Sequence, residues 1–328
     1  MVALGAAIVI GISVGSVYIS PGTVWDALWS KADPTSNLIV REIRVPRVLV
    51  GAMVGASLAM SGAILQGITR NPLADPHIFG ISAGAALVAV IFIVLLPTVS
   101  NEQVELNLAS THLFTLNVVQ PLSLLGGLAG GGLAYVMAWR GGVSPVRLAL
   151  AGIAVTSMLS AITSGILVTS AFSAQIGLRW LIGGLSQRNW NDVQLLAPYF
   201  LIGTSVALIM ARQVNVIALG DELATSLGQR VERTRFLLAA TAALLANAAV
   251  SIAGLIGFLG LIVPHFVRLL LGNDYRIVIP ASAVFGAILL VLADTVARTA
   301  FDPQELPVGV LTAVMGGPVF ILLVRSRA

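Results

Sequence analysis

The chain has 328 residues, of which 57% are hydrophobic and only 10% are charged, and its formal net charge is +4. Soluble domains carry about 25% charged residues, so this composition excludes an ordinary water-soluble domain and indicates a protein that lies in lipid. The chain has no cysteine, which excludes disulfides, thiol chemistry and cysteine-ligated zinc.

Long apolar runs follow one another along the whole chain. A membrane-spanning helix needs about 20 mostly apolar residues. We therefore expect an all-α, polytopic fold of about ten transmembrane helices in a single transmembrane domain, residues 1–328. The predicted spans are residues 3–20, 47–67, 78–97, 114–138, 148–170, 192–211, 234–254, 256–271, 277–298 and 307–324. Around Gly254–Gly260, one long span followed by a re-entrant piece is an alternative to two spans.

The basic residues predict how the chain is oriented. None precedes the first run, which is therefore interpreted as a span and not as a cleavable signal peptide. Cytoplasmic loops carry an excess of lysine and arginine. With both termini in the cytoplasm, eleven basic residues face the cytoplasm and seven face outside. Because they are scattered between apolar runs, a nucleic-acid partner is not expected.

Glycines recur at four-residue spacing inside several predicted spans. The pairs are Gly51/Gly55, Gly80/Gly84 and Gly127/Gly131. Helices in lipid associate by close backbone approach, which small residues permit. We therefore expect these glycines to lie where helices pack tightly, with a minority lining a pathway.

A basic cluster lies on the predicted outer side, just before the second span. Arg41, Arg44 and Arg47 occur within seven residues. Arginines on the outer side act against the positive-inside rule. Some other requirement, such as a docking partner, is therefore expected to keep them there.

The turn between the second and third spans contains Pro72 and Pro76, which prevent a continuous helix. Two interpretations fit this segment. It is either a simple interhelical turn or a loop that faces a pathway, with Asn71 exposed as a gate.

Residues 212–235 form the longest polar segment inside the chain. Acidic residues open its central part and arginines close it, an order that suits a short helix and its dipole. Leu223 and Leu227 are four residues apart and give that helix a small apolar face, which could dock in a groove of a partner. The alternative is a solvated connector. The candidate docking residues are Gly220, Asp221, Glu222, Leu223, Leu227 and Gly228.

Few other polar groups lie within the spans. Asp294 and Arg298 are four residues apart, and ionisable groups in membranes are usually paired. They form either an internal ion pair, or Arg298 projects outward beside Arg44 and Arg47. His265 follows a proline, a context more typical of a structural role than of a metal ligand or proton relay.

The chain lacks the motifs by which a protein supplies its own energy or chemistry. It has no P-loop and no nucleophile elbow. Intramembrane carboxylates are too few for an ordinary proton-coupled transporter. We therefore predict a protein that is not an enzyme and that takes its energy from another polypeptide.

Several motifs, in order along nearly the whole chain, resemble the FecCD-like family of permease subunits, which serve ABC importers of iron-siderophores, haem and vitamin B12. The matching segments are Arg44–Arg47, Ser61–Gly67, Arg70–Pro76, Gly80–Ala86, Ala151–Ala154, Gly257–His265, Ala293–Arg298 and Glu305–Thr312. The resemblance implies the type II ABC importer permease fold.

The resemblance also implies partners and a place in the cell. The chain is expected to form a homodimer in the bacterial cytoplasmic (inner) membrane, with two cytoplasmic ABC ATPase subunits and one substrate-binding protein outside. ATP and magnesium would be held by the partner ATPase, with no cofactor or metal on this chain. The cargo would be an iron chelate (siderophore or haem) or cobalamin.

Roles carry over to matching residues. Arg44, Arg47 and Arg298 match arginines that receive the binding protein, and Arg41 is a possible extra contact. Asn71 and Leu73 match part of the cytoplasmic gate.

The remaining matches lie on the cytoplasmic side. The segment Gly220–Gly228 matches the coupling helix that seats in the ATPase. A second gate element precedes the fifth span, but Ser144-Pro145-Val146 departs from the small hydroxyl residues expected there, so no polar role is carried over.

Two alternatives to an importer permease are a stand-alone transporter and a membrane enzyme. A stand-alone secondary transporter or channel would move a small solute without an ATPase, against which the scarcity of intramembrane acids counts. An integral-membrane enzyme would need a cluster of catalytic polar groups at one membrane depth, and the sequence offers none.

Overall fold

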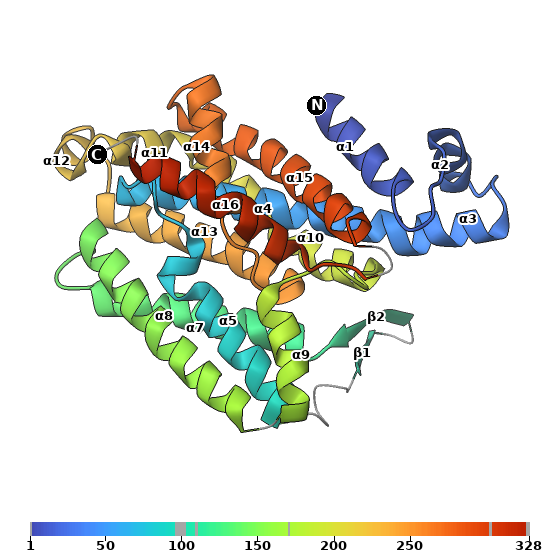
Figure 1. The fold of residues 1–328 in the computed structure, drawn as a ribbon. Helices are drawn as coiled ribbons and strands as arrows, with labels where there is room; N and C mark the ends of the chain where they lie inside the picture. The colour runs from blue at the N-terminus through green and yellow to red at the C-terminus, as the bar shows by residue number, and fades with distance from the viewer. Residues whose placement is uncertain (1, 96–102, 109–110, 170, 302–303, 326–328) are drawn as a thin grey trace.

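The computed structural model describes residues 2–95, 103–108, 111–169, 171–301 and 304–325 (Figure 1). Within these residues, six helices are long and apolar enough to cross a membrane, and four shorter apolar helices accompany them. The six and the four together correspond to the ten predicted spans. The all-α, polytopic prediction is confirmed, and a small two-stranded antiparallel hairpin, with residues 103–108 paired to residues 111–117, accompanies the helices.

The elements before residue 118 are α1 (Val2–Ser13), α2 (Pro21–Leu28), α3 (Pro34–Leu38), η1 (Ile39–Arg44), α4 (Val45–Thr69), η2 (Pro76–Phe79), α5 (Ile81–Val90), η3 (Ile91–Leu95), β1 (Gln103–Leu108) and β2 (Thr111–Asn117). The later elements are α7 (Val119–Ala138), α8 (Pro145–Val168), α9 (Ala171–Ile182), α10 (Trp190–Ile209), α11 (Ala211–Ala218), α12 (Asp221–Ser226), α13 (Val231–Ala253), α14 (Leu259–Leu271), α15 (Tyr275–Thr299) and α16 (Val308–Arg325).

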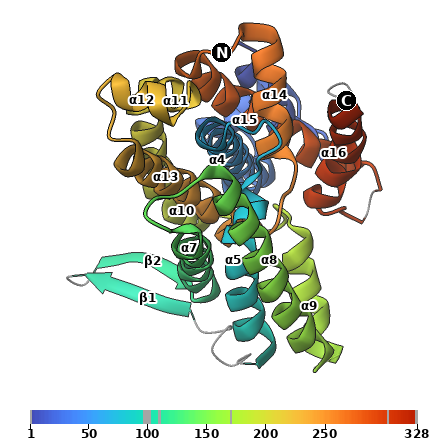
Figure 2. The same ribbon diagram turned by 90° about the vertical axis from the view of Figure 1, so that its left-hand side faces the viewer.

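Helix α4 is the central element of the fold. Figure 2 views the molecule nearly along this helix and shows α10, α13, α14 and α15 around it, and each of them contacts it. Most of its residues are buried. A helix that is apolar all round, as this one is, fits the centre of a bundle and not its edge.

Glycines bring the backbones of α4 and α15 into direct contact. A Cβ atom built on Gly55 would lie 2.2 Å from the carbonyl oxygen of Gly286, and one built on Gly286 would lie 2.4 Å from the carbonyl oxygen of Gly55. No side chain fits at either position without moving a helix. This confirms, for Gly55, the prediction that spaced glycines mark tight packing.

A second layer is formed by α5, α7, α8 and α9, at the bottom of Figure 1. Here too, glycines set the distance between helices: a Cβ on Gly84 would lie 2.3 Å from the carbonyl oxygen of Gly126. Helix α8 is mostly exposed, since only 22% of the most apolar 18-residue stretch of this helix is buried within this chain. Its outer face is therefore free for lipid or for another polypeptide.

The predicted spans differ from the structure at three places. The first span ends at Ser13 and not at residue 20, and α2 and α3 follow it. The fourth begins at Val119, because residues 114–117 belong to β2. Helix α9 has no counterpart among the predicted spans, because its 12 residues are too few to cross a membrane.

The glycine-rich junction of the seventh and eighth predicted spans separates two helices. Helix α13 ends at Ala253 and α14 begins at Leu259, with non-helical backbone between them. Gly254 has a φ of 71°, and a Cβ there would lie 2.2 Å from the carbonyl oxygen of Trp180. The chain therefore forms two separate helices here. Because α14 has only 13 residues, the choice between two spans and one long span followed by a re-entrant piece stays a prediction.

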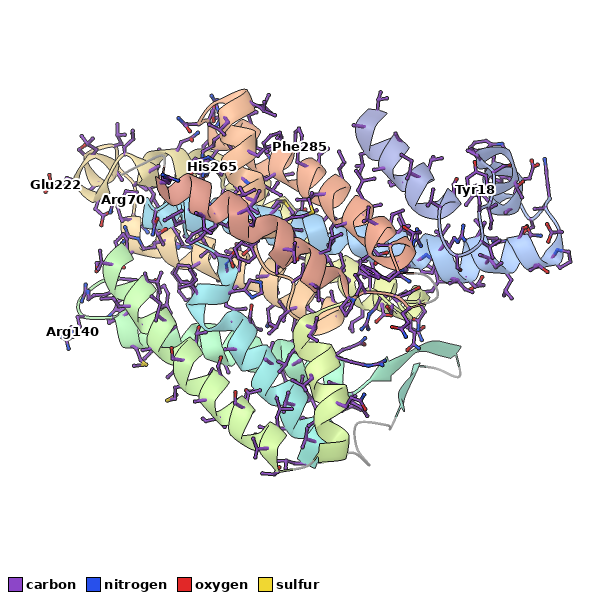
Figure 3. All side chains as sticks on the ribbon, in the orientation of Figure 1. Tyr18, Arg70, Arg140, Glu222, His265 and Phe285 are labelled. Carbon is purple, nitrogen blue, oxygen red and sulfur yellow. The ribbon has the colours of Figure 1, made fainter. Side chains whose placement is uncertain are left out.

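The long helices run between two opposite ends of the molecule. In Figure 1, α12 lies at the left end, and α2 and α3 lie at the right end. Helix α16 finishes at the same end of the molecule as α12, although Figure 2 shows the two helices on opposite sides of the bundle. Figure 3 shows that Arg70, Arg140 and Glu222 gather at that end too, whereas Tyr18 lies at the other.

Candidate functional site

A buried ion pair joins α4 to α15 at the end opposite α12. Arg47 donates to both carboxylate oxygens of Asp294, with Nε–Oδ2 at 2.8 Å and Nη2–Oδ1 at 2.9 Å. The two side chains are only 8% and 6% exposed. Such a two-pronged contact matches the planar guanidinium to the carboxylate, which suits a pair that must be held in a fixed orientation.

Glu305 adds a second carboxylate to Arg47 from the loop before α16. The Nη1 atom of Arg47 lies 3.0 Å from Oε2 of Glu305, and the hydroxyl of Ser186 donates to the same oxygen at 2.8 Å. Burial raises the pKa of Glu305, but the positive charge of Arg47 and the hydrogen bond from Ser186 outweigh it and leave that pKa below its ordinary value.

Two further arginines of this end hold backbone carbonyls. Arg44 donates from Nη1 to the carbonyl oxygens of Ile12 and Ser13, at 2.7 and 2.9 Å. Arg298 donates to that of Gly11. The last carbonyls of a helix lack intrahelical donors, and cations are favourable there. The two arginines therefore fix where α1 ends.

The sequence predicts three arginines available at the outer mouth, but the structure buries all of them: Arg44, Arg47 and Arg298. The local pair between Asp294 and Arg298 is also replaced, because Asp294 pairs with Arg47. Among the four arginines predicted to receive a binding protein, only Arg41 is exposed. Contact of these residues with a partner stays a prediction.

The cluster is nevertheless unbalanced in charge. Three arginines (Arg44, Arg47 and Arg298) face two carboxylates (Asp294 and Glu305), which leaves one positive charge in excess. The Nε atom of Arg298 has no hydrogen-bond partner among the described residues. Within the buried cluster, one arginine is therefore left without a neutralising carboxylate.

We expect the contribution of Glu305 to stability to depend on pH. Because its pKa is lowered in the folded protein, its contribution is complete above its ordinary value of 4.5 and is lost as the pH falls through the lowered value. The thermal midpoint of Glu305→Gln should lie below that of the unmodified protein at pH 7, and the two should converge toward pH 3. A difference that is constant from pH 7 to pH 3 would contradict this assignment.

The predicted gate residues lie in the turn between α4 and η2. The Oδ1 atom of Asn71 accepts the backbone N–H of Leu73 at 3.0 Å, and its carbonyl accepts the N–H of Ala74 at 3.1 Å. Both bonds close the turn on itself. Asn71 therefore shapes this loop, and its amide is partly used inside the turn.

The same turn lines a cavity of about 750 Å³ between α8, α14 and α16. Asn71 and Leu73 contribute from one side, and Pro145 and Val146, at the start of α8, from another. The two gate elements suggested by the sequence therefore meet at one cavity, and its lining is largely apolar. Their opening and closing as a gate stays a prediction.

Helix α12 has the shape expected of a docking element. It is bounded by Gly220 and Gly228, whose φ angles are 112° and 79°, a backbone region that glycine adopts readily. Leu223 and Leu227 are 57% and 65% exposed, whereas Ala224 is fully buried. The helix therefore rests on the bundle by one face and leaves its leucines in solvent.

Two buried polar groups in the α12 half of the molecule were not among the predicted site residues. Arg235, counted only as a loop charge, has a side chain that is 1% exposed and pairs with Asp221. Gln66 donates from Nε2 to the carbonyl of Gly260 at 3.0 Å and accepts from Arg268. The available signal was a polar residue at the edge of an apolar run, which is usually paired.

Comparison with known proteins agrees with this architecture. The FecCD transport family model matches residues 3–326. The Fe(3+)-citrate import system permease protein YfmD of Bacillus subtilis (strain 168) is 43% identical, over 92% of this chain and 84% of that protein. The cobalamin import system permease protein BtuC of Halobacterium salinarum (strain ATCC 700922 / JCM 11081 / NRC-1) is 44% identical, over 94% of this chain and 81% of that protein.

A solved structure has the same fold. It is an inward-facing conformation of an ABC transporter described as metal-chelate type, with a TM-score of 0.85 and 29% sequence identity, over 99% of this chain and 97% of that one. The match of the family model to nearly the whole length, together with relatives above 40% identity, shows that this chain belongs to the FecCD transport family.

Proposed function

We propose that the chain is the membrane-spanning permease subunit of an ATP-driven importer that moves an iron chelate (siderophore or haem) or cobalamin into the cytoplasm. The observation that carries the proposal is the placement of the gate segments and the exposed helix α12 at one end of a bundle that belongs to the FecCD transport family. The chain itself makes and breaks no covalent bond.

The working unit in this proposal is a dimer of two copies in the bacterial cytoplasmic membrane, with both termini in the cytoplasm. Support comes from α8, whose exposed apolar residues Val146, Leu150 and Ile153 also line the cavity. A cavity that borders an exposed helix face is closed most simply by the same face of a second copy, which gives a symmetric pathway.

The energy comes from two cytoplasmic ABC ATPase subunits, which hold ATP and magnesium. Helix α12 is the contact for each of them. Its two exposed leucines supply an apolar anchor, and an amphipathic helix seated in a groove is a recurrent way for proteins to associate.

The outer end receives one substrate-binding protein. Arg41 is exposed, and the buried arginines beneath it carry an excess positive charge, so acidic groups on a partner would be attracted to this end. Complementary charge of this kind guides association and fixes orientation more than it adds affinity. The binding protein also selects the cargo.

Transport assays in proteoliposomes test the proposal. The chain is purified with the ATPase and binding protein that accompany it, and uptake of ferric citrate, a ferric hydroxamate, haemin and cobalamin is measured. We expect ATP-dependent uptake of one of these compounds. Uptake that is driven by an ion gradient without any ATPase would instead establish a stand-alone transporter.

Substitution of the α12 leucines should separate the permease from its ATPase. With Leu223→Asp and Leu227→Asp together, we expect the ATPase to be lost from the purified complex, because charges replace both apolar anchors. Stability should change little, since both side chains are exposed. The matched control is Leu219→Asp, at an exposed leucine just before α12. Normal recovery of the ATPase with the double variant would contradict this role.

A further inference from the structure

The carboxylate of Asp221 ties α12 to two other segments at once. Its Oδ1 atom accepts from Nη2 of Arg70 at 2.9 Å and from Nη2 of Arg235 at 2.7 Å. Arg70 follows the last residue of α4, and Arg235 lies in the first turns of α13. A single oxygen of the surface helix therefore bonds to two different transmembrane helices.

One arm leads to the first gate segment. Arg70 has a φ of 52°, a left-handed conformation that is uncommon for any residue but glycine. It reverses the chain directly before the turn that contains Asn71 and Leu73. The side chain that bonds to Asp221 and the backbone that sets the direction of this turn thus belong to one residue.

The other arm leads to the second gate segment. Arg235 donates from Nη1 to the carbonyl oxygen of Val143, and the N–H of Val143 donates to Oε2 of Glu232 at 3.1 Å. Arg235 and Glu232 are themselves paired, three residues apart on α13. Both backbone polar groups of Val143, its N–H and its carbonyl, are hydrogen-bonded in this way, one residue before Ser144.

Ser144 is the N-cap residue of α8. Its hydroxyl accepts the N–H of Arg147 at 3.3 Å and caps the helix. Pro145 and Val146, which line the cavity, are the first two residues of that helix. The chain of contacts from Asp221 to the cavity is therefore continuous along this arm.

Because Arg235 is buried, the contacts from Asp221 through Arg235 to Val143 are expected to move together with α12. Its side chain is 1% exposed, whereas that of Asp221 is 45% exposed. A buried guanidinium is strongly destabilised when its carboxylate is withdrawn. A displacement of α12 therefore has two outcomes. Either Arg235 and its partners move with α12, or the ion pair between Arg235 and Asp221 breaks at a large cost in free energy.

From these contacts we infer that Asp221 is a positioning residue that transmits the displacement of α12 to both cavity-lining segments, through Arg70 to Asn71–Leu73 and through Arg235 to Ser144–Val146. This inference rests on the proposed function, in which α12 is the contact for the ATPase. It is supported by an unbroken series of hydrogen bonds between charged groups, which connects α12 to the end of α4 and to α13.

The test compares three variants in the assembled transporter, with both copies, the ATPase and the binding protein. Asp221→Asn removes the charge and keeps the shape. Arg70→Gln breaks only the exposed arm, and so reports even where Asp221→Asn fails to fold. Arg233→Gln is the matched control, because this exposed arginine of α13 lies two residues from Arg235 and forms no ion pair among the described residues.

Three quantities are measured: ATP hydrolysis, uptake of whichever of the four compounds the unmodified complex imports, and the distance between spin labels at Leu73→Cys in the two copies. The absence of native cysteine makes this labelling specific. We expect Asp221→Asn and Arg70→Gln to keep ATP hydrolysis within about twofold and to lose at least tenfold in uptake per ATP, about 1.4 kcal/mol of coupling. The spin-label distance should no longer change on addition of ATP.

Normal uptake per ATP with a normal distance change in folded Arg70→Gln and Asp221→Asn would overturn the inference. The same holds if Arg233→Gln is impaired as much as they are, since the effect would then be one of surface charge. Failure of the unmodified complex to import any of the compounds with ATP would count against the proposed function and not against the relay. Loss of the ATPase from the variants would show docking and not transmission.

Discussion

Replacing Asp294 by leucine should lower the stability of the folded protein by about 3–5 kcal/mol, the range measured when one partner of a buried ion pair is removed. The carboxylate is 6% exposed and receives two hydrogen bonds from Arg47. Without it, three arginines of the cluster face only Glu305, whose side chain is 41% exposed. Because the site is buried, solvent replaces little of the lost charge.

The double variant Arg47→Leu/Asp294→Leu is the matched control. It removes one positive and one negative charge, so the excess charge of the cluster stays as it was. Replacement of a whole buried pair by apolar residues is often close to neutral. We therefore expect the double variant to regain most of the stability that Asp294→Leu loses.

Thermal unfolding in detergent provides the measurement, with the fluorescence of the five tryptophans as the signal. A loss of this size corresponds to a fall in Tm on the order of 10 °C. A double variant that is no more stable than Asp294→Leu would show that shape, and not compensation of charge, holds α4 and α15 together at this end.

The same pair shows what sequence alone could not supply. Asp294 and Arg298 are four residues apart, so local spacing offered them as partners, and such pairs do form on helices. The structure joins Asp294 to Arg47, which is 247 positions away. A contact between helices distant in the chain depends on which faces pack together, and no single-sequence pattern specifies that.

Other features were predictable, since the physics that decides them is local. Apolar length identified the ten helices, because lipid requires it. Glycines marked the break between α13 and α14, because only glycine adopts φ of 71° without cost at Gly254. The exposed leucines of α12 followed from their spacing on a short helix.

The hairpin was missed although its sequence carries a signal. Residues 103–108 read Gln-Val-Glu-Leu-Asn-Leu, a polar–apolar alternation that indicates a strand. Residues 114–117, the end of the second strand, are continuous with the next apolar run, which is why the predicted span begins at residue 114. Burial of Arg44 and Arg298 was missed for a different reason: the carbonyls that they bind lie at the end of α1, and a sequence does not show where that end is placed.

Replacing Gly62 by alanine should disrupt the packing of α14 on α4. A Cβ atom at this position would lie 1.9 Å from the carbonyl oxygen of Gly260 and 2.4 Å from its carbonyl carbon. Both contacts are to backbone, so no side chain can rotate away. The same carbonyl accepts a hydrogen bond from Gln66, and a shift of α14 would also lengthen that bond.

We expect Gly62→Ala to cost about 1–3 kcal/mol or more, as overpacking of tight cores does, and to reduce transport further, since Leu261 of α14 lines the cavity. Gly165→Ala is the matched control, because the same methyl group on α8 would have nothing within 4 Å. There, alanine should be neutral or stabilising, since it is the better helix former by about 1 kcal/mol. The two variants are compared by thermal unfolding in detergent and by uptake in proteoliposomes. Equal stability of both would contradict direct backbone contact between α4 and α14, and with it the close packing on which the central position of α4 depends.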